Sequence, residues 1–202
     1  GSLEPTVATE AFAAALRRMD KICPQFHLAL QSGSDTVLAR MKRRYNSEQF
    51  LRGVENLRAQ FPRASFTTDI LTGFPGETQA EFEETRTLIE KVGFARVHVF
   101  PFSPRPGTPA ADMPGQLSSG EKELRTRELI ALGKRVANDY LQSWVGSETT
   151  LLPEERVEGR WEGYTPEYLR VRLRVSDVCV QGEPVKIRLL KAGSDCMNGE
   201  LL

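Results

Sequence analysis

The sequence predicts an α/β protein in which part of a parallel (βα) barrel, with three strands and their helices, precedes a small antiparallel β-barrel. Strand-like and helix-like segments alternate through the first two-thirds of the chain, as they do in βαβ units. Residues 147–202 instead hold short strand-like runs split by Gly, Pro and Asp. Three strands cannot close a barrel, and the chain begins just before a helix, so we expect an incomplete barrel.

Four helices follow from apolar residues at helical spacing. Ser47 is the expected N-cap of the second helix, and capping boxes at Thr78–Glu81 and Ser118–Glu121 begin the third and fourth. The fourth helix is long and should end at about residue 145. The defining apolar positions are Phe12, Ala15, Leu16, Met19; Phe50, Val54, Leu57, Phe61; Phe82, Thr85, Leu88, Ile89, Val92; Leu124, Leu129, Leu132 and Val136.

Strands are expected between these helices, over residues 25–30, 64–71 and 97–100. The pattern changes near Gly146, which we take as a domain boundary. Domain 1–146 then holds the partial barrel and the long connecting helix, and domain 147–202 holds the β-barrel. Strands in the second domain are expected over 149–152, 169–175 and 185–190.

Composition limits the classes of function. The 202 residues include 27 basic and 27 acidic side chains, so no global field attracts nucleic acid or membrane. No apolar run approaches the roughly 18 residues of a membrane span, so no membrane partner is expected. Three distant cysteines favour a reducing cytoplasm over a disulfide framework. With only two histidines besides, we expect no metal ligands in this chain.

Residues 27–35 form the first motif, His-Leu-Ala-Leu-Gln-Ser-Gly-Ser-Asp. His27, Ala29 and Gln31 share one face of a strand, and in a barrel this face points inward. Gln31 and Ser32 would then lie at the carboxyl end, where barrels bind ligands. A capped strand-to-helix turn with a hydrogen-bonded core histidine explains the motif equally well.

Residues 68–78 form the second motif, in which a strand meets two glycines and a helix start. Asp69 inside an apolar strand costs several kcal/mol unless it has a partner or a ligand. Gly73 and free N–H groups at the helix start could meet a polar or anionic ligand group. The alternative is a turn with a buried polar network.

Residues 41–45 and 96–109 add two further candidates. Arg43, in Met-Lys-Arg-Arg-Tyr, offers a planar fork for a carboxylate or phosphate, although a solvated helix end is the alternative. Residues 96–109 predict a strand that runs into a loop stiffened by prolines. Such a loop holds polar groups in place at little entropic cost on binding.

Alternating cations are the candidate feature of the second domain. If the strands at 169–175 and 185–190 pair, one outer face carries five cations that could meet an RNA backbone, with Trp161, Tyr164 and Tyr168 nearby for stacking. Residues 147–202 hold eight basic and ten acidic residues, so a solvated outer face remains an alternative. The five cations are Arg170, Arg172, Arg174, Lys186 and Arg188.

Together, the segments 27–35, 41–45, 68–78 and 98–110 resemble the MiaB-like radical-SAM methylthiotransferases in residues, order and spacing. Residues 3–5, Leu-Glu-Pro, resemble the end of that family's third barrel strand. The part after residue 147 is similar to its TRAM domain, a small β-barrel thought to bind RNA. The resemblance spans nearly the whole chain.

The resemblance implies a parent enzyme that uses S-adenosyl-L-methionine and 4Fe-4S clusters to add a methylthio group to a hypermodified adenosine beside the tRNA anticodon. The sequence of residues 98–101, His-Val-Phe-Pro, favours the MtaB subgroup, which acts on threonylcarbamoyladenosine. The isopentenyl-adenosine subgroup and a branch that modifies a ribosomal protein remain alternatives.

By position, the resemblance also implies site residues. It places Glu77 one position later than the family pattern, so we interpret Glu77 as a helix-start residue only. Ser103, Arg105 and Gly107 would border the substrate entrance. The implied cofactor-binding residues are Gln31, Ser32, Arg43, Asp69, Gly73, Phe100, Pro101 and Phe102.

This chain departs from the family in one respect, because it contains no Cys-x-x-x-Cys-x-x-Cys. We therefore expect no catalytic residue in it, no activity of the chain alone and no cofactor bound to it. The expected partner is tRNA, and self-association is expected through the exposed edge of the strand at 25–30. A stand-alone RNA-binding module without catalysis is the alternative from another class.

Overall fold

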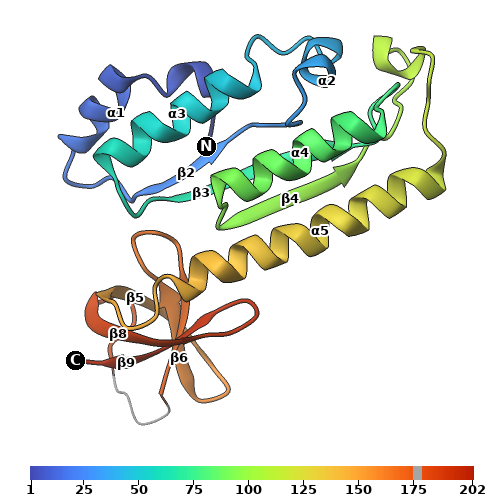
Figure 1. Ribbon diagram of the computed structural model, residues 1–202. Helices are drawn as coiled ribbons and strands as arrows, with labels where there is room; N and C mark the ends of the chain where they lie inside the picture. The colour runs from blue at the N-terminus through green and yellow to red at the C-terminus, as the bar shows by residue number, and fades with distance from the viewer. Residues whose placement is uncertain (175–178) are drawn as a thin grey trace.

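The computed structural model shows a four-stranded parallel sheet, a long helix and a closed five-stranded barrel (Figure 1). It describes residues 1–174 and 179–202, so residue 175 of the strand expected at 169–175 lies outside the described part. The elements are β1 (Ser2–Leu3), η1 (Pro5–Val7), α1 (Glu10–Arg17), β2 (Gln25–Leu28), α2 (Asp35–Arg40), α3 (Ser47–Gln60), β3 (Ser65–Thr72), α4 (Gln79–Val92), β4 (Arg96–Pro101), η2 (Pro109–Ala111), α5 (Ser119–Gln142), β5 (Glu148–Val157), β6 (Arg160–Tyr164), β7 (Arg170–Leu173), β8 (Val185–Ala192) and β9 (Met197–Leu201).

The predicted fold class is confirmed, with two corrections. The sheet has a fourth strand, because β1 pairs in parallel with β2 through Ser2–His27 and Leu3–Leu28. The first strand therefore has an upstream neighbour at these two positions. The barrel is mixed rather than antiparallel, because β7 and β9 run parallel. Self-association through the sheet edge stays a prediction.

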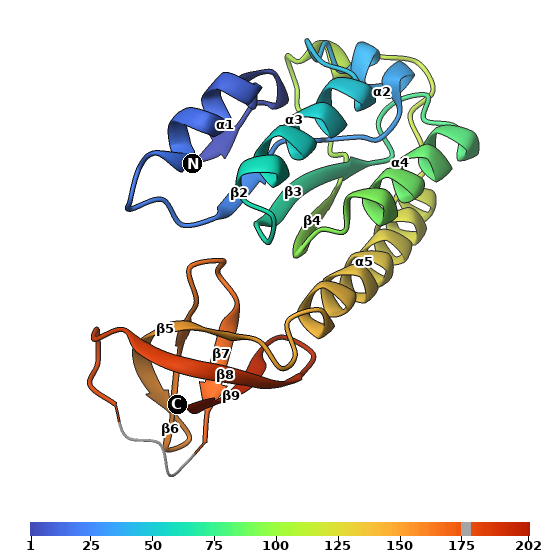
Figure 2. The same cartoon turned by 60° about the vertical axis from the view of Figure 1, so that its left-hand side comes forward.

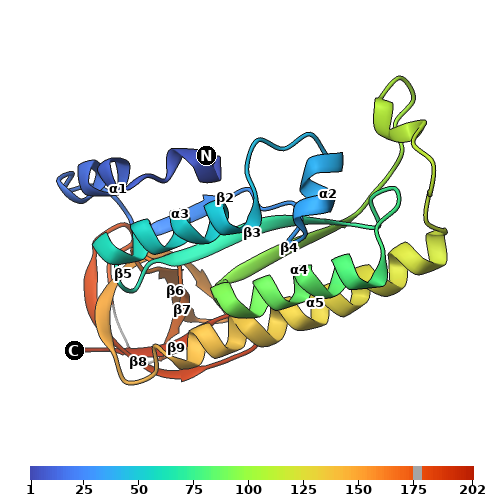
Figure 3. The same cartoon turned by 45° about the horizontal axis from the view of Figure 1, so that its top comes forward.

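The parallel sheet has one apolar and one polar face. Phe26, Leu28, Phe66 and Ile70 alternate with polar neighbours and are buried under the helices. Figure 3 shows α3, α4 and α5 side by side along the sheet. The opposite, inner face carries side chains of intermediate exposure, namely Gln25, His27, Thr67, Asp69 and His98. Period-two alternation thus places the polar side chains of three strands on one uncovered face.

Helix ends agree with the sequence in part. The capping boxes at Thr78 and Ser118 are confirmed. Asn46, rather than Ser47, caps α3, because its side chain accepts from the Gln49 amide at 2.8 Å. Met19 lies beyond the end of α1 and is exposed.

Leu124 does not belong to the buried stripe of α5. It precedes the buried Leu129 by five residues, which is about 140° around a helix, and it is exposed. Among the helices of the described part, none is both long and apolar enough to cross a membrane.

Strand order in the barrel is β5-β6-β7-β9-β8, with closure between β8 and β5. A single face with all five cations required the strands of Arg170 and Lys186 to pair, and this condition is not met, because β9 lies between β7 and β8. β6, β9 and α2 were not expected from the sequence. The barrel core includes Trp144, which follows α5, together with Tyr140 and Leu141 from its last turn.

Side chains of residues 63–65, called the latch below, connect the amino end of the sheet to the barrel. Figure 2 shows the barrel below this end of the sheet. The guanidinium of Arg63 stacks on the Trp144 ring, with 3.6 Å between its Cζ and the ring centroid. It also donates to Ser147 Oγ at 3.0 Å and to the Ser143 carbonyl at 3.2 Å. Ser65 Oγ donates to the Glu167 carbonyl in the β6–β7 loop at 2.7 Å. The barrel thus meets the sheet opposite the carboxyl ends of its strands.

The latch leads to a first prediction. Arg63→Ala removes one cation–π contact and two hydrogen bonds, and we expect a loss of about 1–2 kcal/mol that is concentrated at the junction. Hydrogen exchange should become faster in residues 140–147 and 165–169 and stay unchanged in β3. Arg52→Ala is the matched control, because among the described residues Arg52 pairs only with Glu48, on the solvent side of α3. Equal exchange in both variants would contradict a role for the latch.

Candidate ligand site at the carboxyl ends of the strands

Gln31 extends β2 past its last regular residue. Its amide donates to the Asp69 carbonyl and its carbonyl accepts from the Leu71 amide, both at 2.9 Å. Gln31 has φ +68°, a left-handed conformation that is uncommon for residues other than glycine. This turn directs the chain away from the sheet edge toward α2, and it leaves the Gln31 side chain half-buried at the carboxyl end.

Ser32 and Gly33 lie against α4. The buried Ser32 hydroxyl is 3.3 Å from Thr85 Oγ1, and the Gly33 amide donates to the same oxygen at 2.9 Å. A Cβ at residue 33 would lie 2.5 Å from the Thr85 Cα, so only glycine fits there. Ser32 is therefore enclosed, with its hydroxyl beside Thr85 and its amide donating to the Leu30 carbonyl at 2.9 Å.

A partner for Asp69 is expected from the sequence, and in the structure this partner is His27. Asp69 Oδ2 lies 3.4 Å from His27 Nε2 across the β2–β3 pair. His98 is directly opposite Asp69 on β4. Burial, and secondly the nearby Arg96, lower the pKa of His98. These three side chains form a polar cluster on the inner face.

Gly73 and Glu77 shape the turn after β3. Gly73 has φ +68°, and its amide donates to Glu77 Oε1 at 3.1 Å. Glu77 is buried and pairs with Arg125 of α5 at 2.5 Å, and Arg125 also donates to the Glu77 carbonyl at 2.9 Å. The Gly73 amide is therefore occupied within the chain.

Glu77 is more than a helix-start residue, because it precedes the cap of α4 and binds the turn to α5. The sequence does signal this partner, since Arg125 lies one helical turn before the buried Leu129 on α5.

Tyr45 holds the segment of Arg43 near β2, a role that sequence reasoning missed. Its buried hydroxyl donates to the Ala29 carbonyl at 2.7 Å and approaches the Leu30 carbonyl at 3.2 Å. Burial raises the pKa of Tyr45. Arg43 itself is exposed and has no ion-pair partner within residues 1–174 and 179–202. In this part of the chain, the Arg43 side chain is therefore exposed and unpaired.

The two phenylalanines at the end of β4 differ in their surroundings. Phe100 lies on the inner-face register of β4 and is 52% exposed, whereas Phe102 packs edge-on against Phe74 with ring centroids 5.2 Å apart. Pro101 and Phe102 border a cavity of about 400 Å³ against the first turns of α5. The predicted entrance residues Ser103, Arg105 and Gly107 are all exposed.

Most of the five barrel cations have an acidic or hydroxyl partner. Arg170 and Arg172 both bind Glu162, which is buried, while Arg174 binds Glu200. Arg188 binds Glu148 at 2.7 Å, and Lys186 donates to Thr150 Oγ1 at 3.1 Å. Tyr164 and Tyr168 remain exposed, with ring centroids 5.8 Å apart.

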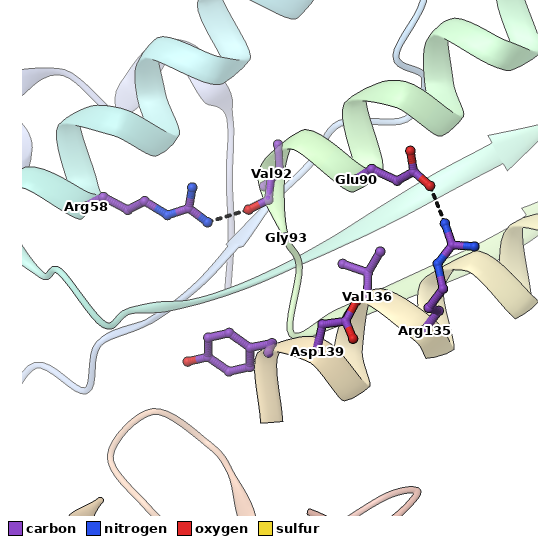
Figure 4. Close-up of a pocket in the computed structure, with 8 residues that line it drawn as sticks. Arg58, Glu90, Val92, Gly93, Arg135, Val136 and Asp139 are labelled. Carbon is purple, nitrogen blue, oxygen red and sulfur yellow. Dashed lines mark hydrogen bonds and ion pairs between the residues drawn. The ribbon is translucent and has the colours of Figure 1, made fainter. Parts of the chain in front are cut away.

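A second cavity, of about 440 Å³, lies among α3, α4 and α5 (Figure 4). Arg58 donates to the Val92 carbonyl there, and Arg135 pairs with Glu90. Burial raises the pKa of Tyr140 at its rim to about 12. None of the sequence motifs described above falls in this cavity.

The chain was compared with protein families, solved structures and curated proteins. Residues 2–89 match the radical SAM superfamily. A solved structure titled as coproporphyrinogen III oxidase (HemN) from Escherichia coli, a radical SAM enzyme, shares the fold with a TM-score of 0.56 over 67% of this chain and 31% of that chain, at 18% identity. Residues 2–89 thus form part of a radical SAM domain.

The curated relatives that the chain matches are tRNA methylthiotransferases, the family that the sequence resembles. Threonylcarbamoyladenosine tRNA methylthiotransferase MtaB of Bacillus subtilis is 37% identical over 100% of this chain and 46% of its own length. MtaB of Thermotoga maritima is 45% identical over 77% of this chain and 36% of its own length. The tRNA-2-methylthio-N(6)-dimethylallyladenosine synthase of Symbiobacterium thermophilum is 39% identical over 98% and 43%. The chain spans less than half the length of these relatives.

Proposed function

We propose that this chain forms the carboxyl-terminal half of a cytoplasmic tRNA methylthiotransferase that acts on threonylcarbamoyladenosine beside the anticodon. The observation that carries the proposal is the similarity to MtaB of Bacillus subtilis, which covers the chain from the sheet through the barrel. The uncovered polar face and the loops at the carboxyl ends supply a place for a nucleoside.

The residues present fit S-adenosylmethionine, which would supply the reactive carbon radical when it is bound and reduced. The exposed Phe100 ring offers a flat surface for a base, and the unpaired Arg43 guanidinium suits the methionyl carboxylate. Gln31 would bring its half-buried side chain close to the ligand. An iron–sulfur cluster does not fit, because no three ligating side chains gather in the described part of the chain.

For RNA, the exposed tyrosines of the barrel are stronger candidates than its arginines. Ion pairing offsets the charge of Arg170, Arg172 and Arg188, so phosphate attraction from this face is weak. Tyr164 and Tyr168 offer ring faces on which an unpaired base can stack, a contact worth about 1–3 kcal/mol per base. We expect Tyr168→Ala to weaken binding of an anticodon stem-loop RNA about tenfold, and Tyr168→Phe to keep it.

A chimera tests the proposed function. The segment of Bacillus subtilis MtaB that aligns with this chain is replaced by residues 3–202, and the chimera is expressed in a strain without MtaB. We expect mass spectrometry of digested tRNA to detect the methylthio form of threonylcarbamoyladenosine. Asp69→Ala in the chimera should abolish this nucleoside, and Asp20→Ala, at an exposed site outside the helices, should not.

Other products decide among the alternatives. A methylthio group on dimethylallyladenosine alone would assign the chain to the other subgroup. A soluble, full-length chimera that modifies no nucleoside, while the parent enzyme does, would refute the proposal.

A further inference from the structure

Tyr168 stands at a position of the β6–β7 turn where glycine is the usual residue. The Tyr168 amide donates to the Thr165 carbonyl at 2.9 Å, which closes a turn with Pro166 at its second position. The Thr165 amide donates to the Leu169 carbonyl at 3.0 Å, so Tyr168 is the last residue of the loop. Its φ is +61°, in the left-handed region that bulky side chains rarely adopt. Three-residue hairpin loops favour glycine at this last position, so a tyrosine there costs stability.

The side chain of Tyr168 does not offset this cost by packing in the core. Tyr168 is 61% exposed and Tyr164, at the end of β6, is 36% exposed, with 5.8 Å between the two ring centroids. Because most of the Tyr168 ring remains in water, its burial contributes little stabilisation. Strained residues cluster at sites that contact ligands, so the strain at Tyr168 points to a ligand for the exposed ring.

A side chain of the parallel sheet holds this turn in place. Ser65, the first residue of β3, is 1% exposed, and its hydroxyl donates to the Glu167 carbonyl at 2.7 Å. The Glu167 carbonyl and the Tyr168 amide belong to one planar peptide group. Ser65 binds the oxygen of this group and the Thr165 carbonyl accepts from its nitrogen, so both of its polar atoms are held. The orientation of this group determines where the Tyr168 ring projects.

We propose that Ser65 is a positioning residue for RNA. By holding the peptide group before Tyr168, it keeps the Tyr168 ring beside Tyr164, and the two rings form an ordered surface for an unpaired base before RNA binds. A surface that is ordered in advance lowers the entropic cost of binding. Stacking suits any base, because every base has a flat face. The choice of RNA as the ligand rests on the proposed function.

The first test measures thermal unfolding of the full chain and its affinity for an anticodon stem-loop RNA. Tyr168→Gly should raise the melting temperature by about 2–4 °C, because glycine relieves the strain, and should weaken RNA binding about tenfold. Glu158→Gly is the matched control, because Glu158 also has a positive φ, of +53°, in the β5–β6 turn, and its side chain is 80% exposed. It should raise the melting temperature similarly without weakening RNA binding.

The second test separates a positioning role of Ser65 from a role in folding alone. Ser65→Ala should weaken stem-loop binding about threefold to tenfold in the unmodified chain and should have no effect on affinity in the Tyr168→Gly background, because Ser65 acts through Tyr168. A role in folding alone would lower the melting temperature in both backgrounds and leave the affinity unchanged. A duplex of the same stem without its loop should bind all variants equally, because its bases are already stacked on one another.

Three results would overturn the inference. The first is full affinity of Tyr168→Gly for the stem-loop, the second is an equal effect of Ser65→Ala on affinity in both backgrounds, and the third is no binding of the stem-loop by the unmodified chain at millimolar concentration.

The chimera described above tests the proposed function separately. If the chimera modifies no nucleoside while the variants of Tyr168 and Ser65 behave as expected, the proposed function fails and the RNA surface stands. An active chimera together with full affinity of Tyr168→Gly would have the opposite meaning.

Discussion

Arg125→Ala should destabilise the chain by about 3–5 kcal/mol, because it leaves the Glu77 carboxylate buried without its partner. The Glu77 side chain is 3% exposed, and its two polar neighbours are the Gly73 amide and Arg125. Urea denaturation at pH 8 measures the loss. Arg127→Ala is the matched control, since Arg127 is two residues away on α5. Within residues 1–174 and 179–202, its only ion pair is a long, exposed contact with Glu123.

The same variant should show a characteristic pH dependence. Burial raises the pKa of Glu77, and Arg125 opposes that rise. Without Arg125 the pKa rises further, so Glu77 binds a proton in the folded state more readily than in the unfolded state. The deficit should therefore shrink as the pH falls from 8 to 5. The double variant Arg125→Met with Glu77→Gln should recover most of the loss, and a deficit that is independent of pH would count against a buried charge.

Capping motifs and apolar periodicity predicted those elements that depend on residues close together in the sequence. The capping boxes at Thr78 and Ser118 and the strand at 65–72 follow from residues within one or two turns. Period-two alternation likewise indicates that His27 and Asp69 lie in strands with one polar face. These elements determine the inner face, which is why much of the candidate site can be located from the amino-acid pattern alone.

What sequence reasoning missed depends on which strands become neighbours. The arginines of β7 alternate as expected, but the insertion of β9 and the cross-strand Glu162 decide that they are paired. The residues next to Glu162 in the sequence give no indication that its carboxylate pairs with arginines of a neighbouring strand. Tyr45 is a similar case, because its hydroxyl binds backbone carbonyls fifteen residues away or more.

Glu81→Gln should cost about 2 kcal/mol at pH 7, the second largest loss expected here. Glu81 completes the capping box of α4, and both of its carboxylate oxygens accept from Arg40, at 2.8 and 2.9 Å. Hydrogen bonding to Arg40 lowers the pKa of Glu81 to about 2 from 4.5. That difference corresponds to about 3 kcal/mol, which solvent screening around the partly exposed Arg40 reduces.

The sign of the pH effect is fixed by the lowered pKa. The stabilisation is complete above the unfolded-state value of 4.5 and disappears as the pH falls through about 2, so Glu81→Gln and the unmodified chain should converge over this range. Glu121→Gln is the control, because Glu121 completes an equivalent capping box on α5 without an arginine fork. Thermal or urea unfolding should show a clearly smaller loss for Glu121→Gln. If the two losses are equal, the cap alone accounts for the effect, and the Arg40 fork that joins α2 to α4 contributes nothing measurable.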